Sequence, residues 1–131
     1  MFSKEMLIGI LLGSSKVDFH IERAKDSQIG YRVKLKLMIR ADLPFLNGIK
    51  RSLEQHSITS VLIEKESNTR PRPLLRIGGI KNLYKITKLV PNLPDAKSEW
   101  IMFREIVDIL GENKHRTTEG LERILELKGV I

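Results

Sequence analysis

The chain contains no cysteine, which excludes disulfides, cysteine-ligated zinc and thiol catalysis. This absence fits a reducing compartment, such as an organelle matrix or a prokaryotic cytoplasm, without identifying one. Long apolar runs are missing as well, because the longest, Met6–Leu12, is far shorter than the roughly 20 residues that span a bilayer. That run also lacks the basic flank and cleavage site of a signal peptide. We therefore expect no membrane partner.

Acidic residues are scarce over most of the chain. Residues 1–97 hold 9 Asp and Glu against 18 Lys and Arg, whereas residues 98–131 hold 7 against 5, and the net charge is +7. A basic body of this kind favours a polyanionic partner, the simpler alternative being a merely basic surface. With 131 residues, 41% of them hydrophobic, we expect one domain over residues 1–131 with its own core.

Aromatic residues make up only 5% of the chain. Trp100 and most of the phenylalanines occupy apolar positions at helical spacing, which predicts that they lie in the core. No aromatic cluster is visible on which the bases of a single strand could stack. For a nucleic-acid partner, the composition therefore favours contacts with backbone and grooves.

Hydrophobic periodicity switches along the chain between the helical repeat and the strand repeat. In chain order it predicts a helix over Met6–Gly13, strands over Lys16–Glu22 and Tyr31–Arg40, a helix from Asp42-Leu43-Pro44 to about His56, strands over Thr59–Lys65 and Leu74–Ile77, and helices over Ile80–Val90, Ser98–Leu110 and from the N-cap Thr117 to about Lys128. This order predicts an α+β fold with an αββαββα core, in which helices cover one face of a four-stranded antiparallel sheet.

Particular side chains have expected places in these helices. Asp42 is expected to cap the helix that it precedes, and Gly111 to end the helix that starts at Ser98. The apolar stripes of the helices predict buried positions for Phe45, Ile80 and Ile101, among others.

The strand over residues 31–40 places four cations on one face, because Arg32, Lys34, Lys36 and Arg40 alternate with apolar residues. No acid is interspersed among them, and such a row suits a two-stranded ribbon in a major groove. A solvated charged face is the alternative interpretation. With Asp18 and Glu22 as further polar groups, we expect nucleic acid to be bound by Arg32, Lys34, Lys36, Arg40, Arg72, Arg76 and His20.

Gly9 and Gly13 lie four residues apart on one face of the first helix. Glycines at this spacing let another backbone approach closely. One interpretation is that the helix packs tightly on its own sheet. The other is that the two glycines form a dimer interface between two copies of the fold.

Four segments in this order resemble the LAGLIDADG homing endonuclease family, and the resemblance covers essentially the whole chain. The segments are Leu7–Ser15, the stretch from Gly30-Tyr31-Arg32-Val33 to Leu43–Leu53, Ile77–Leu93, and Phe103–Leu127. The resemblance implies that the first helix is the family's signature helix. It also implies that a single-motif member pairs these helices in a homodimer, with a metal-binding acid at the end of each.

The acid position of the signature is Ser14 in this chain, and the glycine after it is Ser15. A hydroxyl is a poor ligand for Mg²⁺ beside a carboxylate, so the resemblance implies that the metal site is lost. We therefore expect no catalytic acid, metal or cofactor. Lys97 is similar in position to a basic residue of the family's active site, while a plain surface lysine before a helix is the alternative.

The sequence therefore predicts a homodimeric nucleic-acid-binding protein derived from a homing endonuclease, without cleavage activity. Its partner would be duplex DNA or structured RNA, either intron or ribosomal, and in the latter case it would suit a ribonucleoprotein. One alternative is an active endonuclease that uses Mg²⁺ in an altered site. Another is a protein-interaction module whose sheet face meets an acidic partner.

Overall fold

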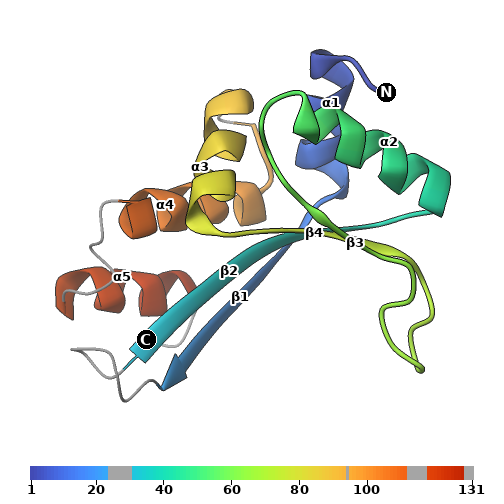
Figure 1. Ribbon diagram of the computed structural model, residues 1–131. Helices are drawn as coiled ribbons and strands as arrows, with labels where there is room; N and C mark the ends of the chain where they lie inside the picture. The colour runs from blue at the N-terminus through green and yellow to red at the C-terminus, as the bar shows by residue number, and fades with distance from the viewer. Residues whose placement is uncertain (24–30, 94, 112–117, 129–131) are drawn as a thin grey trace.

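The computed structural model describes residues 1–23, 31–93, 95–111 and 118–128 (Figure 1). Its elements, in chain order, are α1 (Lys4–Ser14), β1 (Lys16–Arg23), β2 (Tyr31–Arg40), α2 (Leu43–Glu54), β3 (Val61–Ile63), β4 (Leu74–Gly78), α3 (Ile80–Leu89), α4 (Ser98–Gly111) and α5 (Thr118–Lys128). No helix in these ranges is long and apolar enough to cross a membrane.

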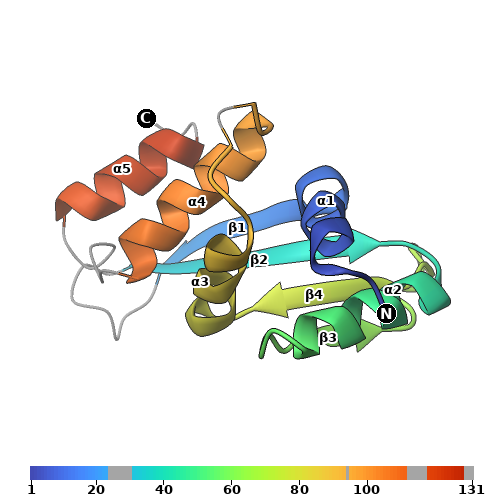
Figure 2. The ribbon, with the colours of Figure 1, turned by 90° about the horizontal axis from the view of Figure 1, so that it is seen from above.

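A four-stranded sheet with the order β1-β2-β4-β3 forms one layer of the molecule. Each neighbouring pair of strands is antiparallel, and the central pairing of β2 with β4 joins the two predicted strand pairs into one sheet. Seen from above, α1, α3 and α4 lie over the strands (Figure 2). The predicted α+β fold, with helices on one face of a four-stranded antiparallel sheet, is confirmed.

The core lies between the sheet and the helices, where the alternation in β2 directs Leu35, Leu37 and Ile39 toward the helical layer. Trp100 and Phe103 of α4 are fully buried, with ring centroids 5.1 Å apart. Arg104, one residue on, donates hydrogen bonds to the last carbonyls of α3, which satisfies groups that a helix end leaves unpaired. This contact locks α4 against the end of α3.

Three apolar side chains that were predicted to be buried are partly exposed. Phe45 retains 39% of its accessible surface, Ile80 38% and Ile101 45%. Each lies at the edge of its helix's apolar stripe, and a stripe indicates the buried face only approximately. The ring of Phe45 contacts that of Phe2 in a T-shaped arrangement, with the ring centroids 5.2 Å apart. These burial predictions were wrong.

The ends of α1 and α2 also differ from the predictions. Ser3 caps α1, because its hydroxyl accepts a hydrogen bond from the Met6 amide at 3.2 Å, so the helix begins two residues early. Asp42 stands at the N-cap of α2, but its side chain makes no capping hydrogen bond, and that prediction was wrong. The helix stops before His56 because Ser57 adopts a left-handed backbone with φ of 60°.

Strand β3 is shorter than the predicted Thr59–Lys65. The amide of Thr59 donates to the side chain of Asn82 at 3.2 Å, so the start of this segment is tied to α3 and not to β4. Gly111 is the last residue of α4, close to its expected role as a stop, whereas Thr117 lies outside the described residues.

Candidate nucleic-acid interface

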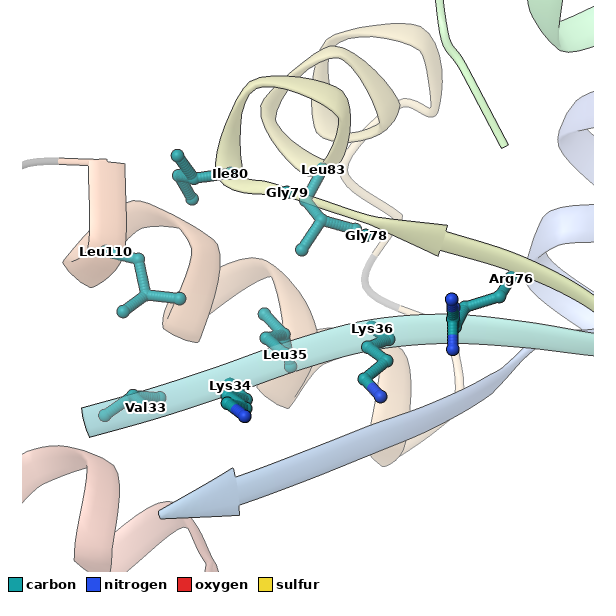
Figure 3. Close-up of a pocket in the computed structure, with 10 residues that line it drawn as sticks. All are labelled: Val33, Lys34, Leu35, Lys36, Arg76, Gly78, Gly79, Ile80, Leu83 and Leu110. Atoms are coloured by element: carbon teal, nitrogen blue, oxygen red, sulfur yellow. The ribbon is translucent and has the colours of Figure 1, made fainter. Parts of the chain in front are cut away.

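The sheet face that points away from the helices carries several of the predicted binding residues. The register sets His20 of β1 beside Lys34 of β2, and Lys36 follows on the same face. Arg76 of β4 shares this face. It pairs with Met38, which lies two residues after Lys36 on β2 and therefore points to the same side of the sheet. Figure 3 shows Lys34 and Lys36 extending from β2 away from α3. Their role in binding stays a prediction.

These cations border an open groove where β4 has ended and β2 continues. The groove has a volume of about 600 Å³ and is lined by Lys34, Lys36 and Arg76 together with apolar residues of β2, α3 and α4 (Figure 3). A polyanion that lies along β2 would meet the three cations together. Arg32 lies further along β2, opposite Glu22, but its side chain lies outside the described residues.

Acids from β1 interrupt the positive charge of this face. Glu22 lies 3.3 Å from the ammonium group of Lys34, and Asp18 lies 3.0 Å from the imidazole of His20. The predicted row of cations without interspersed acids holds along β2, and Asp18 and Glu22, the further polar groups of β1, lie beside it on the assembled face. Within the described part of the chain, Lys36 and Arg76 are face cations without an ion pair.

Arg40 has a different setting from the other strand cations. Its guanidinium group donates two hydrogen bonds to the carboxylate of Glu66, at 2.7 Å and 3.2 Å. This hydrogen bonding lowers the pKa of Glu66 and raises that of Arg40. Because Glu66 begins the segment that leads to Arg70 and Arg72, the pair fixes the connection from β3 to β4. Arg72 is exposed on that connection.

The end of α1 meets the start of α4 at a corner of the sheet. Lys97 donates a hydrogen bond from its Nζ to the carbonyl of Ser15 at 2.9 Å, which places it next to Ser14. The hydroxyl of buried Ser15 donates to the carbonyl of Leu11. The carboxylate of Glu99 accepts a hydrogen bond from the amide of Val17 at 2.5 Å. Sequence reasoning missed Glu99, whose only signal is its place in the first turn of a helix.

The side chains at this corner do not fit the divalent metal that the fold family implies. Ser14 brings no charge, and the neighbouring carbonyl of Ser15 already accepts a hydrogen bond from the ammonium group of Lys97. No group of three or more His, Cys, Asp or Glu residues suited to a metal ion occurs in the part of the chain that the structure describes. Hard divalent cations are held by several oxygen ligands, usually with carboxylates among them.

Gly9 and Gly13 lie on the outer side of α1. Both are exposed, whereas Leu7 and Leu11 on the inner side are fully buried. A Cβ atom added at either glycine would meet nothing within 4 Å. The helix packs on its own sheet through Leu7 and Leu11, and the two glycines do not take part in that packing.

The arrangement of the sheet and its helices is that of the LAGLIDADG homing endonucleases, as solved structures show. The homing endonuclease I-TnaI matches with a TM-score of 0.76 and 20% identity, over 96% of this chain and 85% of its own. I-LtrWI, a LAGLIDADG homing endonuclease bound to target DNA, matches with a TM-score of 0.79 and 20% identity, over 99% of this chain and 44% of its own.

A curated relative points the same way. The chain is 22% identical over 122 residues to a probable intron-encoded endonuclease 3 of Neurospora crassa. This match covers 92% of the chain and only 23% of the relative's length. No protein-family model matches the chain. The resemblance to the LAGLIDADG family that the sequence indicates is thus confirmed.

Proposed function

We propose that the chain binds nucleic acid through the exposed face of its sheet and does not cleave it. The observation that carries the proposal is the set of Lys34, Lys36 and Arg76 on one face, opposite the helices, with two of the three free of ion pairs in the described structure. Two structural neighbours, I-LtrWI bound to target DNA and I-SmaMI bound to cleaved DNA, support the binding part of this proposal and not the absence of cleavage.

The absence of cleavage rests on the corner at the end of α1. A serine stands where the resemblance places the catalytic acid, and the ammonium group of Lys97 is hydrogen-bonded to the carbonyl of the next residue, Ser15. Two divalent metal ions do not assemble with a substrate phosphate unless carboxylates compensate the charge of the ions. An active endonuclease with an altered metal site is equally compatible with the fold, and a cleavage assay separates the two.

The outer side of α1 supports a homodimer as part of the proposal. Gly9 and Gly13 leave the helix surface open, and Met6 on the same helix retains 55% of its accessible surface. A second copy of α1 would cover this surface with a close helix–helix contact. Two sheet faces side by side would then present one extended surface to a nucleic acid.

The salt dependence of binding tests the sheet face. Each duplex phosphate that a cation neutralises contributes about 0.9 to the slope of log K against log salt. Replacing Lys36→Ala together with Arg76→Ala should therefore flatten the slope by up to about 1.8. The measurement is a fluorescence anisotropy titration with the duplex that co-purifies with the protein, repeated over a range of salt concentrations.

A matched control removes the same charge from the helical layer. Lys50→Ala with Arg51→Ala changes two cations of α2, far from the sheet face, and should leave the slope unchanged. If the control flattens the slope as much as the sheet variant does, the nucleic acid lies elsewhere. Binding that does not respond to salt at all would favour the protein-interaction alternative.

A further inference from the structure

We propose that the outer face of α3 is a second nucleic-acid-binding surface, which takes a single-stranded segment and stacks one of its bases on Tyr84. This surface is defined by Lys81, Tyr84, Lys85 and Lys88. It is independent of the sheet face and of whether the protein cleaves. The proposal rests on charge, on the exposed ring and on the position of α3 in the fold.

The lysines of α3 form a row without compensating acids. Lys81, Lys85 and Lys88 recur at intervals of four and three residues, which places them on one side of the helix. The helix contains no acidic residue, and none of the three lysines forms an ion pair with another described residue. The ammonium group of Lys85 donates a hydrogen bond to the carbonyl of Ser57 at 2.7 Å, so Lys81 and Lys88 are the two that border the hollow beside α4. Like charges at this spacing repel one another, so a bound anion would stabilise the row.

Tyr84 stands within this row with its side chain partly exposed and Lys88 over one face of its ring, so a base would stack on the other face. It retains 45% of its accessible surface, and the ammonium group of Lys88 lies 5.0 Å from the ring centroid. An exposed ring beside cations is the combination that binds single strands, since phosphates meet the cations while a base stacks on the ring. A protein partner of acidic character would use the charges without requiring the ring.

A hollow of about 490 Å³ adjoins the ring, between α3 and α4. It is lined by Lys81, Tyr84 and Lys88 from α3 and by Arg104 and Asp108 from α4, among others. Asp108 is the one acid in this lining, against three cations. The edge of a base stacked on Tyr84 would lie in this hollow, next to its polar side chains.

The position of α3 separates this surface from the sheet face. The helix lies over the sheet on the side opposite to the one that presents Lys34 and Lys36 (Figures 1 and 3). A duplex on the sheet face therefore leaves α3 accessible. The protein would hold a duplex and a single-stranded segment at the same time.

The test is binding of a labelled, mixed-sequence single-stranded oligonucleotide in the presence of saturating unlabelled duplex. Lys81→Ala with Lys88→Ala should flatten the salt slope by up to about 1.4, because each phosphate on a single strand contributes about 0.7. Tyr84→Ala should weaken binding about 5-fold or more, whereas Tyr84→Phe should retain it, since stacking requires only the ring. All of these side chains are exposed, and circular dichroism checks that the variants fold.

The control is Lys36→Ala with Arg76→Ala, which removes the same charge from the sheet face. It should reduce duplex binding and leave oligonucleotide binding unchanged, so that failure of one proposal is distinguishable from failure of the other. The inference is overturned if the duplex displaces the oligonucleotide, or if Tyr84→Ala has no effect. It is also overturned if polyglutamate competes as well as the oligonucleotide, because the surface would then serve an acidic protein.

Discussion

At the scale of single residues, Arg40 shows how a partner in space changes the role of a side chain. It shares its strand face with Lys34 and Lys36, yet it donates both of its hydrogen bonds to Glu66 at 2.7 Å and 3.2 Å. Paired guanidinium and carboxylate groups of this geometry are specific in orientation. Arg40 therefore orients the connection that carries Arg70 and Arg72. Arg70 itself lies 3.9 Å from the Glu66 carboxylate, whereas Arg72 is exposed.

Replacing Glu66→Gln should lower the stability of the protein at neutral pH. Hydrogen bonding to Arg40 holds the pKa of Glu66 below its usual value of about 4.3 in the folded state. The pair thus stabilises the fold above that usual value, and this contribution is lost as the pH falls through the folded-state pKa. Urea unfolding should give the variant a lower free energy of unfolding than the unaltered protein at pH 7. This difference should narrow steadily on acidification below pH 4.

Glu64→Gln is the matched control, because Glu64 is exposed and forms no ion pair within the described residues. It should unfold like the unaltered protein at both pH values. If the difference in free energy of unfolding between the unaltered protein and the Glu66 variant persists undiminished in acid, the ion pair does not stabilise the fold.

The sequence identifies residues of this kind only in part. Alternation in the strand predicts that Lys34, Lys36 and Arg40 share a face, which the structure shows. It places Glu22 among the polar groups of the sheet, but it cannot reveal that Glu22 pairs with Lys34 or that Glu66 reaches Arg40, because both contacts depend on the pairing of separate segments of the chain. The proximity of Lys97 to Ser15 likewise spans 82 positions and came from the family resemblance alone.

At the scale of elements, α1 and α3 each present an outer surface that the described chain does not cover. The glycines of α1 leave space for another helix, whereas α3 offers lysines and a ring. Periodicity predicted both helices within three residues of their ends. It misjudged the burial of residues at the edges of the apolar stripes, such as Ile80 and Ile101, since burial there depends on how neighbouring helices pack.

Gly9→Val should weaken dimerisation without destabilising the protomer. A side chain at this position meets nothing within the protomer, and valine replaces a residue of poor helix propensity. Between two closely packed helices, however, the added carbons overlap with the partner. Overpacking of this kind costs about 1–3 kcal/mol, which weakens association roughly 5- to 150-fold. Analytical ultracentrifugation over a concentration series measures it.

Gly111→Val serves as the control, because a Cβ there also meets nothing within 4 Å but the site lies at the far end of α4. It should leave the dissociation constant unchanged. An unaltered protein that sediments as a protomer at every concentration, with and without nucleic acid, would contradict the homodimer.

At the scale of the whole molecule, the proposed binding surface and the corner beside Ser14 lie in different places. The sheet face presents cations along β2 and β4, whereas the corner of Ser14 and Lys97 lies at the end of α1. Removal of the carboxylate from that corner therefore leaves the cations of the sheet in position. This separation is what would allow the binding without cleavage that we propose.

The purified protein should accordingly bind its co-purified duplex but not cut it with Mg²⁺ or Mn²⁺. At the end of α1 a hydroxyl and an ammonium group replace the anionic environment that a divalent cation requires. Ser14→Asp should raise Mn²⁺ affinity measurably by titration calorimetry, and Ser14→Asn, which adds an amide without charge, should not. Metal-dependent cutting by the unaltered protein, lost on Lys97→Met, would instead establish the endonuclease, because the corner would then be catalytic without its carboxylate.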